Sequence, residues 1–218
     1  MKAGAFLFDL DGTLVDTEAA WTRAIVEFVR SRGAETMFEE ILPAVVGRNW
    51  IDIDEEIHRR FPVLGKADPM RDAVELRGFY DRIATDPESM VIGSSVEFFK
   101  KASALAPCAI VSGSPHDDVV AAARLCGIED RVALVLGAGE YAAGKPSPSG
   151  YLKAAELLSV PPRDCVVVED STVGVKAGVD AGMQVVALDR ASLVKQTFEG
   201  QRWLVRDLSE IDFEKEFS

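Results

Sequence analysis

The chain has 218 residues, a length that suits one large domain or one domain with a substantial insertion. Hydrophobic residues make up 48% and charged residues 28% of it, a balance that is typical of globular proteins and excludes a largely disordered chain. The 24 basic and 36 acidic residues give a formal net charge of −12, which disfavours binding to nucleic acids and to anionic membrane surfaces.

The amino-terminal apolar stretch, residues 3–14, is interrupted by Asp9 and Asp11, so it does not form the core of a signal peptide. No later segment approaches the ~20 apolar residues of a membrane span. We therefore expect a cytoplasmic protein without a membrane partner, either a monomer or a small homo-oligomer. The three cysteines are widely spaced, which predicts buried thiols in a reducing compartment: Cys108, Cys126 and Cys165.

Short apolar runs rich in Val, Ile, Leu and Phe alternate with helical segments along most of the chain. This alternation predicts an α/β fold in which helices cover a doubly wound, mostly parallel sheet. The predicted strands are Ala5–Phe8, Cys108–Val111, Val132–Leu136, Cys165–Val168 and Gln184–Leu188. The predicted helices between them are Val119–Cys126, Gly150–Leu158 and Thr172–Ala181.

The segment between the first two predicted strands has helical periodicity and no clear strand pattern. Trp21, Ile25 and Phe28 recur at helical spacing, and prolines mark breaks between helices. We predict a small helical domain over residues 16–87, inserted into a core formed by residues 1–15 and 88–218. The acidic carboxyl-terminal segment, Glu210–Ser218, is expected to be a solvated end.

Acidic and hydroxyl residues follow three of the predicted strands. In an open α/β sheet ligands bind beyond the carboxyl ends of the strands, so these side chains are expected to meet. Grouped carboxylates repel one another unless a cation neutralises them, and oxygen ligands favour Mg²⁺. The segments are Asp9-Leu10-Asp11-Gly12-Thr13, Ser112-Gly113-Ser114 and Glu169-Asp170-Ser171.

The spacing of Asp9 and Asp11 places both carboxylates on one side of an extended chain. One carboxylate can attack phosphorus, while the other gives a proton to the leaving oxygen and later takes one from water. A strongly acidic chain needs local positive charge to hold a phosphate, and Lys145, in the loop after the third strand, is the candidate. Ser112 is a candidate hydrogen-bond donor to a phosphate oxygen.

These residues lie in segments that resemble, in order, the four motifs of the haloacid dehalogenase superfamily. The stretch Phe8–Thr17 is similar to the first motif, Ser112 to the second, Lys145 before a proline to the third, and Val168–Ser171 to the fourth. The helical insertion after the first motif resembles the cap of a subgroup of this superfamily. That subgroup contains phosphoglycolate phosphatases, sugar-phosphate phosphatases and β-phosphoglucomutase.

The resemblance implies a Rossmann-like core with a helical cap and a Mg²⁺-dependent phosphatase that forms an aspartyl phosphate. It implies Asp9 as nucleophile and metal ligand, and Asp11 as general acid/base and as a ligand through its carbonyl. Asp170 would be a further ligand, and Glu169 a nearby or water-mediated one. The phosphoryl group would be held by Ser112, Lys145 and the backbone amide of Gly113.

Residues of the insertion are candidates for recognising the substrate, which we expect to be a small phosphorylated metabolite such as a sugar phosphate. Thr17 and Trp21 lie in a stretch that resembles one facing the pocket in sugar-phosphate phosphatases, and Arg48 could pair with an anionic or hydroxyl group of the substrate. His58 and His116 have no second histidine at metal-ligand spacing, so structural or solvent-exposed roles are predicted for both.

Two alternatives use the same types of residue. A β-phosphoglucomutase-like phosphomutase would return the phosphoryl group to a sugar, but such sequences carry a histidine where this chain has Trp21. A receiver-like signalling module also combines an acceptor aspartate, acidic metal ligands, a hydroxyl and a lysine. Its acidic pair is usually adjacent, and it needs no inserted domain, so the phosphatase is favoured.

Overall fold

The computed structural model describes residues 3–46, 48, 50–190 and 196–217. Its centre is a six-stranded parallel sheet in the order β3-β2-β1-β4-β5-β6. The predicted doubly wound α/β fold is confirmed. The strands are β1 (Ala5–Phe8), β2 (Cys108–Val111), β3 (Val132–Leu136), β4 (Cys165–Glu169), β5 (Gln184–Leu188) and β6 (Trp203–Val205). The edge strand β6 was not predicted, because three residues give too short a pattern to recognise.

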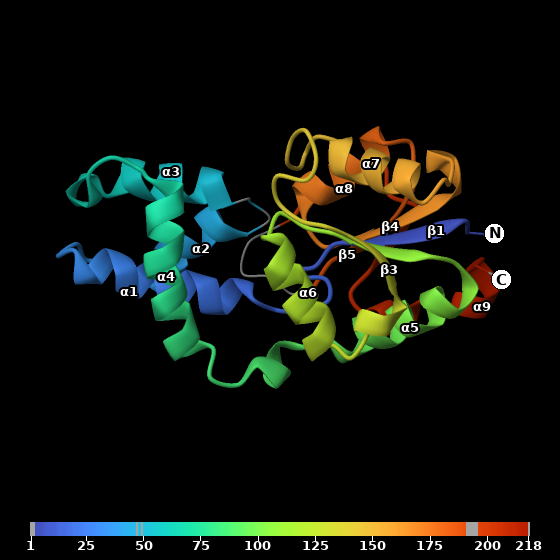
Figure 1. Cartoon of the computed structure of the whole chain (residues 1–218), viewed down its shortest axis with the longest axis horizontal. Helices are drawn as coiled ribbons and strands as arrows, with labels where there is room; N and C mark the ends of the chain where they lie inside the picture. Colours follow the sequence, from blue (N-terminus) through green and yellow to red (C-terminus); the bar gives the residue numbers. More distant parts are fainter. Residues whose placement is uncertain (1–2, 47, 49, 191–195, 218) are drawn as a thin grey trace.

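Helices cover both faces of the sheet (Figure 1). On one face α5 (Gly93–Leu105) and α6 (His116–Leu125) pack against alternate strand residues such as Phe6 and Phe8. On the other face α7 (Ser149–Leu157) and α8 (Thr172–Asp180) pack against the residues in between, such as Leu7. Successive side chains of a strand point to opposite faces, so β1 is buried on both sides. The short 3₁₀ turns are η1 (Pro62–Leu64), η2 (Pro87–Met90), η3 (Glu129–Arg131), η4 (Pro162–Asp164) and η5 (Leu208–Glu210).

The carboxyl-terminal segment is not a solvated end, so that expectation was wrong. Residues 213–217 form the helix α9 (Phe213–Phe217), and both of its phenylalanines are buried in the core. The Phe217 ring lies 5.3 Å from that of Phe6 and 5.1 Å from that of Trp203. The two phenylalanines are four residues apart on one face of the helix, and the free energy of burying them outweighs the local excess of acidic residues.

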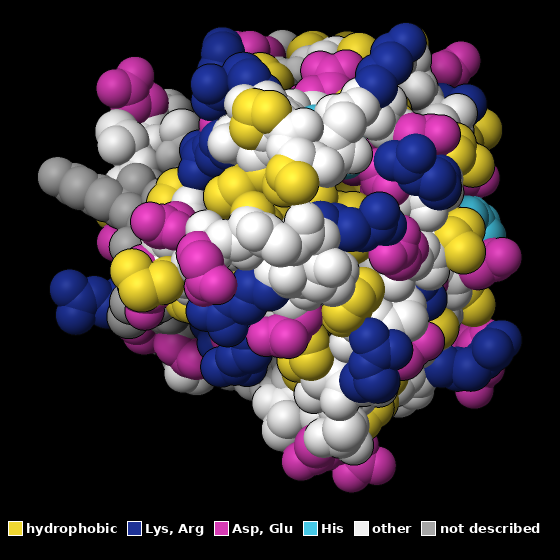
Figure 2. Space-filling view, turned by 90° about the vertical axis from the view of Figure 1, so that its left-hand side faces the viewer, with side chains coloured by type: hydrophobic (Ala, Val, Ile, Leu, Met, Phe, Trp, Pro, Cys, Tyr) yellow, Lys and Arg dark blue, Asp and Glu magenta, His cyan; other side chains and the backbone are white. Residues whose placement is uncertain are grey.

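The described residues between β1 and α5 form four α-helices that lie to one side of the sheet (Figure 1). They pack around a hydrophobic cluster of their own, which includes Ile25, Phe28, Ile41 and Leu76. Their outer surface carries acidic and basic side chains side by side, with hydrophobic side chains between them (Figure 2). The helices are α1 (Glu18–Ser31), α2 (Phe38–Val45), α3 (Trp50–Arg60) and α4 (Pro69–Ile83).

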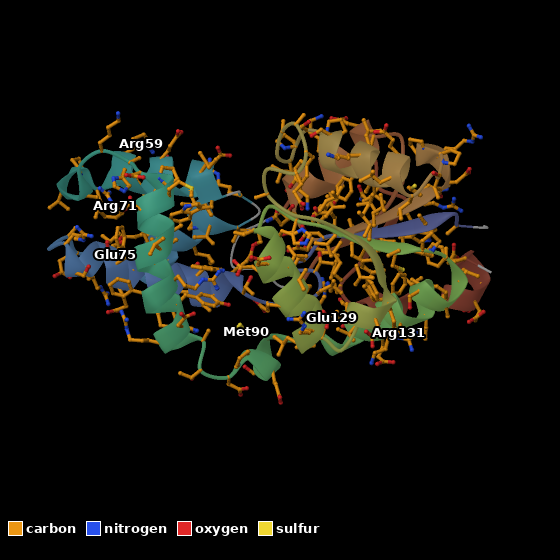
Figure 3. The ribbon with its side chains drawn as sticks, viewed as in Figure 1. Arg59, Arg71, Glu75, Met90, Glu129 and Arg131 are labelled. Carbon is orange, nitrogen blue, oxygen red and sulfur yellow. The ribbon has the colours of Figure 1, made fainter. Side chains whose placement is uncertain are left out.

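The chain leaves the sheet for these helices and returns from them at neighbouring points. Val15 forms an antiparallel bridge with Val91, and the amide of Asp16 donates a hydrogen bond to the carbonyl of Met90 at 2.8 Å. Met90 lies where the chain passes from α4 back towards α5 (Figure 3). Both connections therefore lie at the carboxyl-terminal side of β1, next to the residues discussed below.

Among the described residues, no helix is long and apolar enough to cross a membrane. The predicted burial of the cysteines is confirmed, since all three are buried free thiols. Burial raises the pKa of the Cys108 thiol to about 12, which makes it unreactive.

Candidate active site

The carboxyl ends of three adjacent strands bring the predicted acidic and hydroxyl residues together. β1 pairs with β2 on one side and with β4 on the other, with Phe8 opposite both Ile110 and Val168. Asp9 directly follows β1, and its amide donates to the carbonyl of Val168 at 3.0 Å. The register of the sheet therefore sets Asp9 beside Glu169 and next to the end of β2, which Ser112 follows, although these residues are far apart in sequence.

Lys145 reaches this edge of the sheet from the connection between β3 and α7. Its ammonium group contacts the carboxylate of Asp9 and lies 2.5 Å from Oε1 of Glu169. The side chain of Lys145 is 14% exposed, and the side chain of Asp9 is 10% exposed. Burial by itself would lower the pKa of Lys145, but the charges of Asp9 and Glu169 raise it well above its usual value. The lysine is therefore a fixed positive charge.

Glu169 is held by donors on both of its carboxylate oxygens. Besides the lysine, Oε1 accepts a hydrogen bond from the Tyr151 hydroxyl at 2.9 Å. Oε2 accepts from the amide of Asp170 at 3.0 Å and from the amide and hydroxyl of Ser171 at 3.1 and 3.0 Å. These contacts occupy both carboxylate oxygens of Glu169 and fix its position.

Asp170 lies against the turn that follows Asp9. Thr13 donates a hydrogen bond to its Oδ1 at 3.2 Å. Gly12 has a φ of +88°, and a Cβ on that residue would lie 2.0 Å from Oδ2 of Asp170. Only glycine allows both the backbone conformation and this close approach.

Asp9, Glu169 and Asp170 can each present a carboxylate oxygen within 4.8 Å of the other two. Burial raises the pKa of Asp9 to about 8, with further contributions from Glu169 and Asp11, although Lys145 opposes the shift. Burial and the neighbouring carboxylates also raise the pKa of Asp170 well above its usual value. The positive charge of Lys145 therefore does not balance these carboxylates, and the group has an excess of negative charge. An oxygen-only donor set with this excess fits Mg²⁺.

Asp11 is surrounded by hydroxyl groups. Its Oδ2 accepts hydrogen bonds from Ser112 at 3.2 Å and from Ser114 at 2.7 Å, and its Oδ1 accepts from Thr17 at 2.5 Å. Ser112 itself accepts a hydrogen bond from the amide of Ser114 at 3.0 Å. The hydroxyl predicted to hold phosphate therefore contacts Asp11 in this structure. Gly113 lies half-buried between the two serines.

The three residues predicted to recognise the substrate differ in their surroundings. Thr17 contacts Asp11, as described above, and directly precedes α1. Trp21, on α1, stacks on Tyr80 of α4 with a ring separation of 4.1 Å. Arg48 is exposed in the connection between α2 and α3, and with the described residues its side chain makes neither a hydrogen bond nor an ion pair. The structure thus joins Thr17 to the candidate site but provides no such link for Arg48.

Several residues around the site were not singled out from the sequence. Ser114 lies two positions after Ser112, and this repeat of hydroxyl residues could have indicated that Ser114 also lies at the site. Tyr151 reads as an apolar residue of a helix, and nothing in the sequence points to its contact with Glu169. Arg77 of α4 lies over the ring of Trp21 at 5.4 Å and pairs with Asp118 of α6, which links the helical insertion to the core.

A comparison with models of protein families matches residues 3–182 to haloacid dehalogenase-like hydrolases. This match covers most of the chain and all of the site residues described above. The chain belongs to the haloacid dehalogenase-like hydrolase family. Relatives that are named phosphatases agree, so the predicted family and the predicted enzyme class, a phosphoric monoester hydrolase, are both confirmed.

Two relatives of this hydrolase in Escherichia coli (strain K12) are similar over most of their length. Hexitol phosphatase A is 33% identical over 195 residues, which cover 87% of this chain and 84% of the relative. The 6-phosphogluconate phosphatase is 30% identical over 195 residues, which cover 83% of this chain and 80% of the relative.

Solved structures share the fold of this haloacid dehalogenase-like hydrolase. A β-phosphoglucomutase from Clostridium difficile superimposes with a TM-score of 0.82 at 20% identity, over 99% of this chain and 95% of that one. CbbY from Rhodobacter sphaeroides, in complex with phosphate, superimposes with a TM-score of 0.76 at 24% identity, over 96% of both chains. At these identities the likeness establishes the fold alone.

Proposed function

We propose that this enzyme is a Mg²⁺-dependent phosphatase that hydrolyses a small phosphorylated sugar or polyol through an aspartyl phosphate on Asp9. The observation that carries the proposal is the buried carboxylate of Asp9 at the end of the central strand, in contact with Lys145 and grouped with Asp170. A nucleophile, a fixed positive charge and a candidate metal ligand are then within reach of one phosphate group.

In this proposal Asp9 attacks phosphorus, and the bond between phosphorus and the leaving oxygen breaks. Asp11 donates a proton to that oxygen, so the product leaves as a neutral alcohol. Asp11, now a carboxylate, accepts a proton from the water that attacks phosphorus, and inorganic phosphate leaves with Asp9 restored. The hydroxyl groups of Ser114 and Thr17 orient the carboxylate of Asp11 for both transfers.

The remaining residues hold the phosphoryl group and the metal ion. Lys145, Ser112 and the amide of Gly113 would bind phosphoryl oxygens, with Glu169 holding Lys145 in place. Asp9, Asp170 and the carbonyl of Asp11 would bind Mg²⁺, with Glu169 acting through a water molecule. When bound, Mg²⁺ supplies positive charge that offsets the negative charge developing on the phosphoryl oxygens.

We further propose that residues 16–87 act as a cap over a core formed by residues 1–15 and 88–218. Two relatives are named for phosphorylated polyols and sugar acids, which supports a substrate of that chemical class. Thr17 and Trp21 lie at the start of the cap, so they are the favoured contacts with the substrate, together with Arg48. Closing the cap would exclude bulk water and let cap residues choose the substrate, and opening it would release the product.

The test is a screen of purified enzyme with Mg²⁺ against phosphorylated hexitols, sugars and sugar acids. The screen includes β-glucose 1-phosphate, assayed for phosphate release and for isomerisation. We expect phosphate release from at least one class and no isomerisation. Asp9→Asn should lower kcat by on the order of 10⁴-fold or more while the fold is retained. Isomerisation without phosphate release would replace the proposal with the phosphomutase.

The control for Asp9→Asn is Asp16→Asn. It removes an exposed carboxylate seven positions along the chain and outside the proposed machinery. Asp16→Asn should retain activity, and an Asp9→Asn enzyme that keeps most of its activity would remove the proposed nucleophile.

A further inference from the structure

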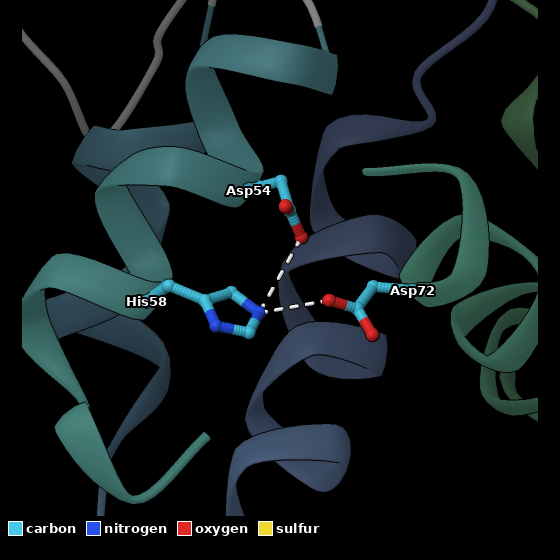
Figure 4. A group of neighbouring side chains, drawn as sticks. All are labelled: Asp54, His58 and Asp72. Atoms are coloured by element: carbon cyan, nitrogen blue, oxygen red, sulfur yellow. Dashed lines mark hydrogen bonds and ion pairs between the residues drawn. The ribbon is translucent and has the colours of Figure 1, made fainter. Parts of the chain in front are cut away.

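The helices α3 and α4 enclose three titratable side chains that the proposed phosphatase reaction does not use: Asp54, His58 and Asp72 (Figure 4). Their side chains are 2%, 4% and 0% exposed. His58 Nε2 lies 2.8 Å from Oδ2 of Asp72 and 3.7 Å from Oδ1 of Asp54. Each residue offers one atom that could bind a metal ion, and these three atoms lie within 4.8 Å of one another.

This cluster is separate from the proposed active site. Arg71, the neighbour of Asp72, lies in the first turn of α4, in the helical insertion to the left of the sheet (Figure 3). Asp54 and His58 are one helical turn apart on α3, so their side chains share a face, and α4 brings Asp72 against that face. The geometry of two helices therefore holds the three groups together.

The ring of His58 is oriented by a backbone carbonyl. Its Nδ1 lies 3.1 Å from the carbonyl oxygen of Gly65, the residue that follows η1. A carbonyl oxygen only accepts, so Nδ1 carries a proton and donates it. The other nitrogen, Nε2, then faces the two carboxylates. Histidines that bind metal ions are held in this way, with the second ring nitrogen donating to a carbonyl or carboxylate.

One carboxylate oxygen in this cluster is buried without a hydrogen-bond partner among the described residues. It is Oδ2 of Asp54. Asp72 has more hydrogen-bond donors, because Arg71 donates to both of its carboxylate oxygens, at 2.8 and 3.1 Å. A proton on Nε2 would form a hydrogen bond with Asp72 at 2.8 Å, whereas Asp54, at 3.7 Å, is too far away to accept one. Burial raises the pKa of Asp54 to about 6, and the neighbouring Asp72 adds to the shift, although the charges of His58 and Arg71 oppose it.

A metal ion between the three side chains would contact all of them. Ligands that lie about 2.0–2.1 Å from a tetrahedral zinc ion are about 3.3 Å from one another. The two distances from Nε2, 2.8 and 3.7 Å, lie on either side of that value, and all three ligand atoms lie within 4.8 Å of one another. An imidazole nitrogen with two carboxylates suits zinc and similar ions better than Mg²⁺.

We infer that Asp54, His58 and Asp72 form a second metal site, which takes a first-row divalent transition ion such as Zn²⁺. The bound ion joins α3 to α4, and the hydrogen bond from His58 to Gly65 extends this link to the turn η1. Its role is structural. The sequence predicted a structural or solvent role for His58, and the two aspartates are the partners that sequence spacing did not reveal.

The test measures Zn²⁺ binding by the full chain, stripped of metal and held in excess Mg²⁺. The Asp170→Asn background removes a proposed ligand of the active-site ion. We expect one Zn²⁺ per chain after dialysis, and a rise in Tm of about 5–10 °C at Zn²⁺ concentrations near 100 times Kd. His58→Gln should abolish both the bound ion and the rise. His116→Gln, which changes the chain's other and exposed histidine, should keep both.

Asp54→Asn keeps the shape of the side chain and provides a second variant should His58→Gln fail to fold. It should weaken Zn²⁺ binding at least tenfold, and the Zn K-edge spectrum of the parent protein should contain one imidazole nitrogen ligand. Equal Zn²⁺ content in the parent, His58→Gln and Asp54→Asn proteins would overturn the inference. So would a parent Tm that does not respond to Zn²⁺.

Discussion

Oε1 of Glu169 lies 2.5 Å from Nζ of Lys145, and the same ammonium group contacts Asp9. Glu169 is itself fixed by Tyr151 and by the start of α8. The position of the positive charge beside the proposed nucleophile therefore depends on residues from β4, α7 and α8. This arrangement leads to the first two predictions.

Replacing Lys145 with Met should reduce both activity and stability. The change leaves the buried carboxylates of Asp9 and Glu169 without their shared partner, and breaking such a pair costs about 3–5 kcal/mol. Excess Mg²⁺ should restore part of the lost stability but not the activity, because the metal ion replaces charge without replacing the contact to phosphate. Urea unfolding with and without Mg²⁺ checks this, and an unchanged midpoint without Mg²⁺ would contradict it.

Replacing Gly174 with Ala should displace Glu169. A Cβ at that position would lie 1.8 Å from Oε1 of Glu169, so the carboxylate must move, and overpacking of this kind costs about 1–3 kcal/mol. We expect a large loss of kcat together with reduced stability. Gly93→Ala is the matched control, because a Cβ there meets nothing within 4 Å at the start of α5, and stability should be kept or slightly increased.

Binding of Mg²⁺ should depend on pH. In the metal-free protein the pKa of Asp9 is raised to about 8, chiefly by burial, so below that pH the carboxyl group is mostly protonated. Binding must release this proton, and Asp170 adds to the release because its pKa is also raised, so the apparent affinity should increase as the pH rises towards 8. Isothermal titration calorimetry in buffers of different ionisation enthalpy measures the proton release. An affinity independent of pH from 6 to 8 would contradict the assignment of Asp9.

The raised pKa of Asp9 also determines how the stability of the metal-free protein changes with pH. An aspartate whose pKa is higher in the folded protein than in the unfolded chain favours the fold most at low pH. This contribution is lost as pH rises from about 4 to about 8. The metal-free protein should therefore lose stability across that range relative to Asp9→Asn, and saturating Mg²⁺ should remove the difference.

Replacing Trp21 with Ala should change substrate selectivity more than phosphoryl transfer. Trp21 stacks on Tyr80 beneath Arg77, at the start of the proposed cap. We expect kcat/KM for the best sugar or polyol phosphate to fall about tenfold or more, and that for p-nitrophenyl phosphate to change less. A uniform loss over the whole substrate panel would instead indicate a structural role for Trp21.

Much of the fold was accessible from the sequence because it depends on local patterns. Apolar runs such as Ala5–Phe8 and Gln184–Leu188 match the observed strands, since strands buried on both faces require continuous apolar residues. The motif residues are found at the strand ends because their order along the chain fixes which strand each one follows. The resemblance to the haloacid dehalogenase superfamily rests on the same order, and the family match confirms it.

Only the tertiary structure decided which side chains meet. The contacts of Ser114 with Asp11, of Tyr151 with Glu169, and of His58 with Asp72 join different elements of the chain. Such contacts depend on strand order and on how helices pack, which are set by the total burial of apolar surface. The burial of α9 also depends on a contact between distant parts of the chain. Its local charge predicts a solvated end, but packing against Phe6 makes burial of Phe217 favourable.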